Sequence, residues 1–151
     1  MMRQLLLTLI AFCFFVSPAS ADKGLISIKS SHNVKETGDR LENILKAKEM
    51  NVFIRINHAE NAQKVGKKLH PTELIIFGNP KVGTPLMLNS QSAAIVLPQK
   101  ALIWEDEAGQ VWFTYNDPKY IATRHNITEC AEVLKKIENA LGNFAKMATM
   151  P

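Results

Sequence analysis

Cysteine is scarce in this sequence of 151 residues: the two that occur, Cys13 and Cys130, cannot build a disulfide scaffold. The sequence has no Cys-x-x-Cys, no histidine pair spaced i, i+4 on an expected helix and no Gly-x-Ser-x-Gly. It therefore lacks the usual patterns of zinc sites and serine-hydrolase elbows, and we expect neither a metal nor a cofactor. With 46% hydrophobic and 21% charged residues, the composition is typical of one globular domain.

A hydrophobic run long enough to span a membrane is also missing. The run from Leu5 to Val16 is about a dozen residues, whereas a bilayer-spanning helix needs roughly 20. Arg3 precedes the run, and small residues at Ala19 and Ala21 follow it. This pattern predicts a signal peptide over residues 1–21, cut after Ala21, and hence a periplasmic or secreted protein without a stable membrane anchor. Residues 22–151 are expected to form a single domain, with its core at about residues 25–146.

A strong excess of one charge is absent as well. Residues 1–21 contain one charged side chain, Arg3, so cleavage would lower the formal net charge from +4 to +3. Such a weak charge, carried by scattered basic residues, gives no reason to expect a nucleic-acid partner. Cleavage would also leave Cys130 as a single thiol, and its place on the apolar stripe of the last expected helix predicts a buried, inert side chain.

The hydrophobic pattern predicts a mixed fold. Period-two alternation and β-branched content indicate strands, and apolar spacings of three and four indicate helices, the first of them capped by Asn33 and the last by Thr128. The expected strands are residues 25–30, 52–57, 73–77, 100–105 and 110–115, and the expected helices are 34–48, 58–69, 86–95 and 128–144, with a loop over 78–83. Two long amphipathic helices need one apolar surface, so we expect an α+β two-layer sandwich: a mostly antiparallel sheet with both long helices on one face. The other face, predicted to carry Arg55, Asn57 and aromatics, would be wet or covered by a second subunit.

The most unusual segment runs from Phe77 to Met87. Its spacing Gly78-x4-Gly83-Thr84 resembles a phosphate-binding loop, but no lysine precedes the threonine, and two prolines remove backbone donors. We therefore interpret the segment as a rigid structural motif, with a small anion near Lys81 and Thr84 as the alternative. The residues of the motif are Phe77, Gly78, Asn79, Pro80, Gly83 and Pro85.

Two further polar clusters are candidates for chemistry. Asp106 lies in the expected hairpin after Trp104-Glu105, and the segment from Tyr115 to His125 precedes the last helix. Arg124 can hold an anion, and a histidine such as His125 can act as an acid, a base or a ligand. The candidate ligand-binding residues are Lys81, Thr84, Asp106, Tyr115, Arg124 and His125.

These segments resemble the family called domain of unknown function 302. The resemblance lies in Thr72–Met87, Leu97-Pro98, Trp104-Glu105-Asp106, Tyr115 with Pro118, and Arg124-His125, and it covers roughly Leu25 to Phe144. It implies a fold like that of the TATA-binding protein, in the order β-α-β(4)-α, and a homodimer. It implies no activity, and the likeness to a DNA-binding protein concerns the fold alone.

Three functions remain open on this reading. The first is a homodimeric module that binds or senses a small molecule or anion through the six candidate residues. The second is an enzyme in which His125 acts as acid or base, Asp106 orients it, and Arg124 or Lys81 holds an anion. The third is a structural or partner-docking protein without a ligand.

Overall fold

The computed structural model describes residues 24–151, so the predicted signal peptide lies outside the described residues. The elements are β1 (Leu25–Lys29), α1 (Val34–Ala47), β2 (Asn51–Asn57), α2 (His58–Lys64), β3 (Thr72–Gly78), α3 (Pro80–Asn89), a 3-10 helix η1 (Gln91–Ile95), β4 (Gln99–Glu105), β5 (Val111–Asn116), α4 (Pro118–Arg124) and α5 (Ala131–Thr149). Along this part of the chain, four short helices (α2, α3, η1 and α4) join the five strands and the two long helices, α1 and α5.

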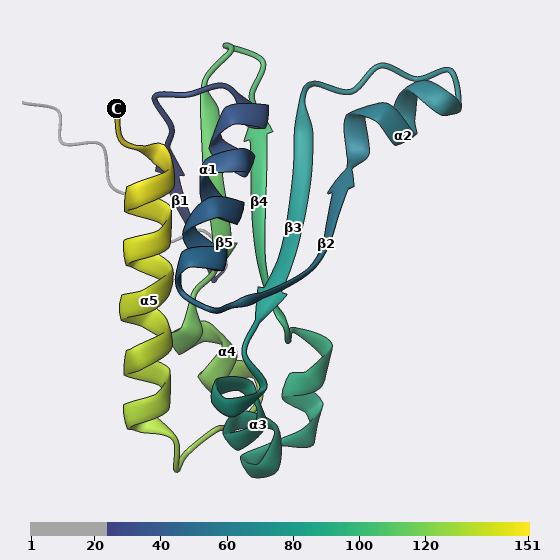
Figure 1. Ribbon diagram of the computed structural model, residues 1–151. Coiled ribbons are helices and arrows are strands. Elements are labelled where there is room, and N and C mark those ends of the chain that lie inside the picture. Colours follow the sequence, from purple (N-terminus) through teal and green to yellow (C-terminus); the bar gives the residue numbers. More distant parts are fainter. Residues whose placement is uncertain (1–23) are drawn as a thin grey trace, which may run out of the picture.

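The five strands form one sheet in the order β1-β5-β4-β3-β2, and every neighbouring pair is antiparallel (Figure 1). The register places Ile75 opposite Ala101 and Ile103 opposite Phe113, and all four side chains are buried. Because side chains alternate along a strand, this register gives the sheet one continuous apolar face. The predicted α+β fold, with its mostly antiparallel sheet, is confirmed.

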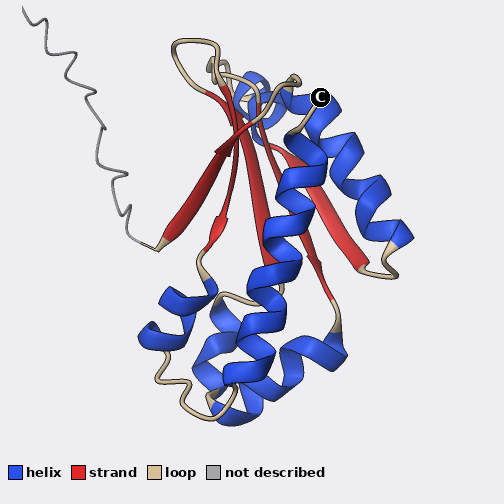
Figure 2. Cartoon of the chain, turned by 90° about the vertical axis from the view of Figure 1, so that its left-hand side faces the viewer, coloured by secondary structure: helices blue, strands red, loops and turns tan. Residues whose placement is uncertain are grey.

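Helices α1 and α5 lie side by side on that apolar face, and α5 extends beyond the sheet toward α3 and α4 (Figure 2). The Asn33 side chain accepts a hydrogen bond of 2.8 Å from the backbone N–H of Glu36 and so caps α1 as predicted. Apolar side chains at helical spacing then point into the core, where Leu41 and Leu45 are fully buried. Both long helices lie on one face, as predicted.

The second face of the sheet differs from the prediction in one respect. A β-bulge between Val52 and Ile54 reverses the alternation of β2, so Arg55 and Asn57 lie on the side of α1 and not on the open face. The aromatic part of the prediction is correct: the rings of Trp104 and Trp112 stack on the open face with centroids 6.5 Å apart.

Several helix boundaries also differ from the sequence prediction. Asn79-Pro80 and Asp117-Pro118 indicate turns, yet in both places the acidic or amide side chain caps a helix that begins at the proline. The expected loop over 78–83 is therefore mostly the start of α3, and α4 was not predicted. The second helix stops at Lys64, and the last begins at Ala131, after Cys130 and not after Thr128.

The Cys130 thiol is half-buried and donates a long contact of 3.6 Å to the backbone oxygen of Pro85. Its place between α3 and α5 partly agrees with the expected burial. Among residues 24–151, no cluster of three or more His, Cys, Asp or Glu side chains could hold a metal ion. None of the helices in this part of the chain has the length and apolarity needed to cross a bilayer.

Candidate functional site

Helix α3 and η1 on one side and the middle of α5 on the other enclose an apolar cavity of 490 Å³. Five of the six motif residues line it; Pro85 does not. The lining residues are Met50, Phe53, Phe77, Gly78, Asn79, Pro80, Val82, Gly83, Thr84, Met87, Ala94, Leu97, Pro98, Gln99, Lys136, Ile137, Ala140, Leu141 and Phe144.

The motif forms one wall because its local structure turns the chain sharply out of the sheet. Strand β3 ends at Gly78, where an added Cβ would lie only 3.3 Å from the Cβ of Pro98, so a side chain would crowd the neighbouring segment. The Asn79 side chain accepts a 2.9 Å hydrogen bond from the backbone N–H of Lys81, and Pro80 supplies the fixed φ of the first helical turn. Helix α3 therefore begins directly at the edge of the cavity.

Helix α5 forms the opposite wall. Residues 136, 137, 140, 141 and 144 line the cavity at the spacing of one helix face. The Phe144 ring packs edge-on against Phe77, with centroids 6.2 Å apart, and both rings line the cavity. Within α3, only Leu86 is fully buried, so little core packing fills the space between α3 and α5.

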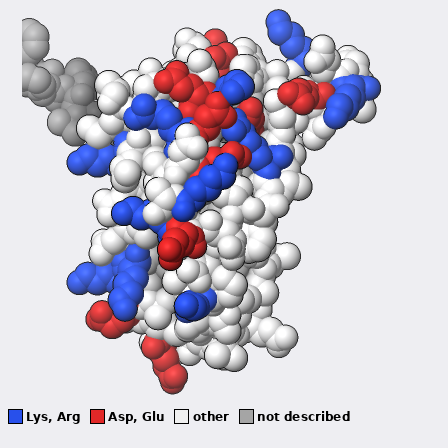
Figure 3. All heavy atoms as spheres, in the orientation of Figure 1, with Lys and Arg blue, Asp and Glu red and all other residues white. Residues whose placement is uncertain are grey.

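The chemistry of the cavity is almost entirely apolar. Its polar lining consists of Asn79, Thr84, Gln99 and Lys136, and no Asp or Glu of the described residues takes part. Figure 3 shows many charged side chains over the upper half of the molecule and further ones at its lower left, while its lower right surface is largely uncharged. A concave apolar site with a few polar groups is the usual form of a small-molecule pocket.

The structure does not gather the six predicted ligand residues into one site. Thr84 lines the cavity, and Lys81 lies exposed beside it on the first turn of α3. Tyr115 lies in the core against Phe113, where burial, Asp117 and Glu138 raise its pKa. Arg124 is exposed at the end of α4. The residues were predicted to converge because they sit near turns, but the turns lie in different parts of the fold.

The proposed acid–base pair of His125 and Asp106 is not formed. Asp106 precedes β5 and His125 follows it, so six strand residues, roughly 20 Å at ~3.4 Å each, separate them. His125 is 8% exposed, and its Nδ1 lies 2.9 Å from the Ser92 hydroxyl, while its Nε2 is buried without a protein partner. This contact ties α4 to η1. In this structure Asp106 therefore does not orient His125.

Asp106 instead organises the β4–β5 turn. Its carboxylate accepts hydrogen bonds from the Trp112 indole at 2.8 Å and from the backbone N–H groups of Ala108 and Gln110. These bonds, that of Trp112 first, lower the pKa of Asp106 below its ordinary value. The turn is thus fixed by an ionised carboxylate and a glycine, Gly109, at positive φ.

The Asp106→Asn variant is expected to melt at a lower temperature than the wild type at pH 7. Because the folded-state pKa of Asp106 is lowered, the stabilisation it gives is present above the unfolded pKa and is lost as the pH falls through the folded value. Thermal melts at pH 7 and at progressively lower pH should therefore show the two proteins converging in acid. A difference that stays constant down to pH 2 would contradict this origin.

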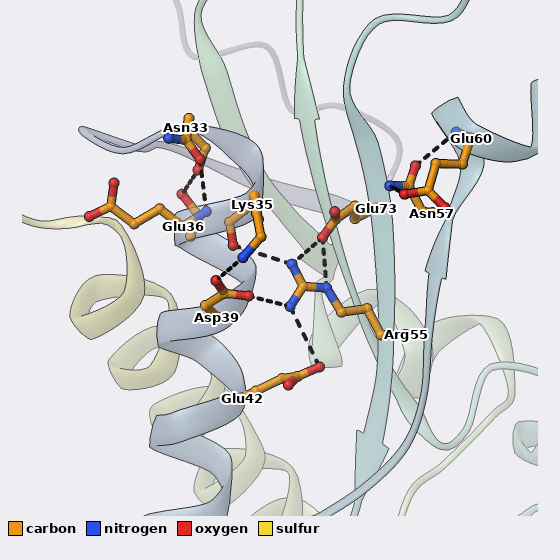
Figure 4. Close-up of polar contacts among 10 residues, drawn as sticks. Asn33, Lys35, Glu36, Asp39, Glu42, Arg55, Asn57, Glu60 and Glu73 are labelled. Atoms are coloured by element: carbon orange, nitrogen blue, oxygen red, sulfur yellow. Dashed lines mark hydrogen bonds and ion pairs between the residues drawn. The ribbon is translucent and has the colours of Figure 1, made fainter. Parts of the chain in front are cut away.

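A second hollow, of 920 Å³, lies between α1 and the segment from β2 to β3, and it is lined by charged side chains. Arg55 lines this hollow, and Figure 4 shows its guanidinium between the carboxylates of Asp39, Glu42 and Glu73. The guanidinium donates at 2.7 Å to both Asp39 and Glu73 and lies 3.7 Å from Glu42. This hollow is larger than the apolar cavity, but its most buried charges, those of Arg55 and Glu73, already bind each other, so we place the candidate site in the cavity.

In the Arg55 cluster, the pKa shifts of Arg55 and Asp39 both favour the charged forms. Burial alone would lower the pKa of Arg55, but hydrogen bonds to Asp39 and Glu73 outweigh it and raise the pKa above its ordinary value. Hydrogen bonds from Lys35 and Arg55 lower the pKa of Asp39. Gly38 of α1 is buried against the guanidinium. The cluster therefore fastens α1 to the sheet.

Comparison with known families gives a match over residues 26–144 to the model described as "Domain of unknown function DUF302". The chain belongs to the DUF302 family. The match includes both walls of the cavity, from Met50 to Phe144, and the motif at residues 77–87. The resemblance found in the sequence is confirmed.

A crystal structure of an uncharacterised conserved DUF302 protein from Bacillus stearothermophilus has the same fold. The TM-score is 0.74, with 20% sequence identity, over 83% of this chain and 98% of the other. At this identity the likeness concerns the fold alone.

Longer relatives carry a functional name. "Fluoride-specific ion channel FluC 1" from Brucella suis is 43% identical over 128 residues, which are 84% of this chain and 50% of the relative. A protein of the same name from Brucella abortus is also 43% identical over 128 residues, and 47% of its length is covered. The DUF302 chain thus spans about half the length of the curated relatives it matches.

Sequence reasoning missed much of the cavity of this DUF302 domain. Phe53, in the expected strand 52–57, lines the cavity beside a β-bulge, and a bulge leaves no clear signal in the sequence. Lys136 was overlooked because it looks like an ordinary solvated lysine of an amphipathic helix. The available signal was that Lys136 directly precedes Ile137, a residue of the apolar stripe of this helix.

Proposed function

We propose that this DUF302 domain binds an apolar small molecule in the cavity between α3 and α5. One observation carries the proposal: the family motif, where the backbone leaves β3, lines an apolar cavity of 490 Å³. Small-molecule sites commonly enclose about 300–1,000 Å³ and have mainly apolar walls. At ~30 Å³ for each atom of water size, the cavity has room for roughly 16 non-hydrogen atoms.

A bare anion fits the cavity less well. The names of the Brucella relatives raise fluoride as a ligand, but an unpaired ion in an apolar site loses its hydration, a penalty of tens of kcal/mol in the idealised limit. Among residues 24–151, the lining offers one ammonium group, that of Lys136, beside the side chains of Asn79, Thr84 and Gln99. This observation favours an apolar ligand over a small inorganic anion.

Fluorescence of the neutral probe N-phenyl-1-naphthylamine tests the proposal on the purified chain. We expect saturable enhancement at one site per chain, competition by 1-decanol and no competition by sodium fluoride. Native mass spectrometry of the same protein should show the added mass of retained ligand. Absence of saturable binding would leave the cavity as a packing defect and favour a structural or docking role.

We further propose that a second copy of the chain covers the open face of the sheet. Apolar side chains that point away from α1 and α5 remain partly exposed on four strands, among them Ile54 at 49%. They are Ile54, Ile56, Leu74, Ile76, Leu102, Trp104 and Trp112. A self-complementary sheet face is suited to a twofold dimer, which buries the same patch on both subunits.

The Leu102→Glu variant is expected to be monomeric, whereas the wild type should sediment as a dimer at micromolar concentration. Leu102 lies on the central part of the open face, where a carboxylate would be buried without a partner in the dimer. Leu88→Glu is the matched control, since Leu88 is 83% exposed on α3. Sedimentation of the wild type as a monomer would refute the proposal.

A further inference from the structure

We infer that the ligand of the cavity is an amphiphile whose anionic head group is held by Lys136; this inference rests on the proposed function. Lys136 is the one charged residue in the described lining, and its side chain is exposed. Its neighbours on the same face of α5, Ile137 and Ala140, line the cavity as well. A lysine in this position can lay its aliphatic stem along the apolar wall and keep its ammonium group at the mouth.

The ammonium group of Lys136 is available to a ligand. None of the ion pairs formed within residues 24–151 includes it, and the nearby Glu138 carboxylate is taken by Lys119 at 2.8 Å. Lys100 lies close in sequence to the lining residues Leu97 and Pro98, but its ammonium group is not free to bind a ligand. Its ammonium group donates to the backbone oxygens of Val96 and Pro98 at 3.3 and 2.9 Å.

The geometry of α5 gives the cavity a polar end and an apolar end. Lys136 is exposed, whereas Phe144, eight residues later on the same helix face, is 7% exposed and packs against Phe77. Eight residues of helix span roughly 12 Å at ~1.5 Å each. A single apolar tail of roughly ten carbons, with its head at Lys136, matches this length and leaves part of the roughly 16-atom volume free.

The inference predicts a difference between two ligands with the same tail. Decanoate and 1-decanol differ in charge, so a favourable contact with Lys136 acts on decanoate alone. In the Lys136→Met variant, decanoate is expected to bind about fivefold more weakly, the upper range for a solvent-accessible ion pair, and 1-decanol about as well as before. Raising the ionic strength should weaken decanoate binding to the wild type toward that of the variant, because salt screens exposed charges.

Competition against N-phenyl-1-naphthylamine at pH 8 measures both ligands with the full chain. Lys135→Met is the matched control: it removes the same charge from the adjacent residue, which does not line the cavity. Lys136→Arg should restore decanoate binding. An equal loss for both ligands, or an equal loss in Lys135→Met, would overturn the role of Lys136 while leaving the apolar site intact. If neither ligand competes with the probe, the proposed function fails as well.

Discussion

The Arg55→Met variant is expected to lose about 3–5 kcal/mol of unfolding free energy, because it leaves a buried carboxylate without its partner. The Glu73 side chain is 10% exposed, and the guanidinium of Arg55 contacts it through two nitrogens. A carboxylate in that position has lost most of its hydration, so removal of the cation costs far more than removal of a surface ion pair. Urea unfolding followed by circular dichroism measures the change.

A control and a rescue separate this effect from a general loss of charge. Arg124→Met removes an exposed arginine and should change the free energy of unfolding by no more than about 0.5 kcal/mol. The double variant Arg55→Met with Glu73→Leu should recover most of the stability, since no buried charge remains. If the double variant is as unstable as the single one, the loss comes from packing and not from the uncompensated carboxylate.

Gly38 gives an independent check on the same contact. An added Cβ at Gly38 would lie 2.5 Å from Nη2 of Arg55 and 3.1 Å from Oε2 of Glu73. Alanine in a helix interior is usually more stable than glycine by about 1 kcal/mol, but here it displaces the guanidinium. Gly38→Ala should therefore destabilise the wild type and become neutral or stabilising when Arg55 is absent. A gain in both backgrounds would contradict the close packing.

The Gly83→Trp variant is expected to lose at least about tenfold in affinity for N-phenyl-1-naphthylamine, which corresponds to ~1.4 kcal/mol. Gly83 lines the cavity, and a Cβ added to it meets nothing within 4 Å, so an indole can enter the space that the ligand would fill. The fold should remain intact or become more stable, since the change removes a helical glycine and buries apolar surface.

The matched control for this variant is Gly142→Trp. Like Gly83, Gly142 lies inside a helix, here α5, and a Cβ added to it meets nothing within 4 Å. Unlike Gly83, it does not line the cavity. The probe should bind Gly142→Trp as it binds the wild type. Titrations of both variants, with thermal melts to confirm folding, give the comparison. Unchanged binding in Gly83→Trp would place the probe elsewhere on the protein.

The sequence alone determined the elements that depend on local pattern. The Asn33 cap, the apolar stripe of Ile137, Leu141 and Phe144, and the alternation in β4 and β5 each arise from neighbouring residues, so the two-layer fold could be predicted. The motif at residues 77–87 was also identified as unusual. Its identification rested on glycine and proline positions, which local backbone geometry dictates.

Only the tertiary structure decided what these elements enclose. The bulge that turns Arg55 toward α1, the roughly 20 Å of β5 between Asp106 and His125, and the cavity that Gly83 and Lys136 line from opposite sides all depend on how distant segments pack. The polar site was predicted from residues that lie near turns in the sequence. The packing of α3 against α5 instead produced an apolar cavity. A cavity is the space that packed elements fail to fill, and no single segment of sequence encodes it.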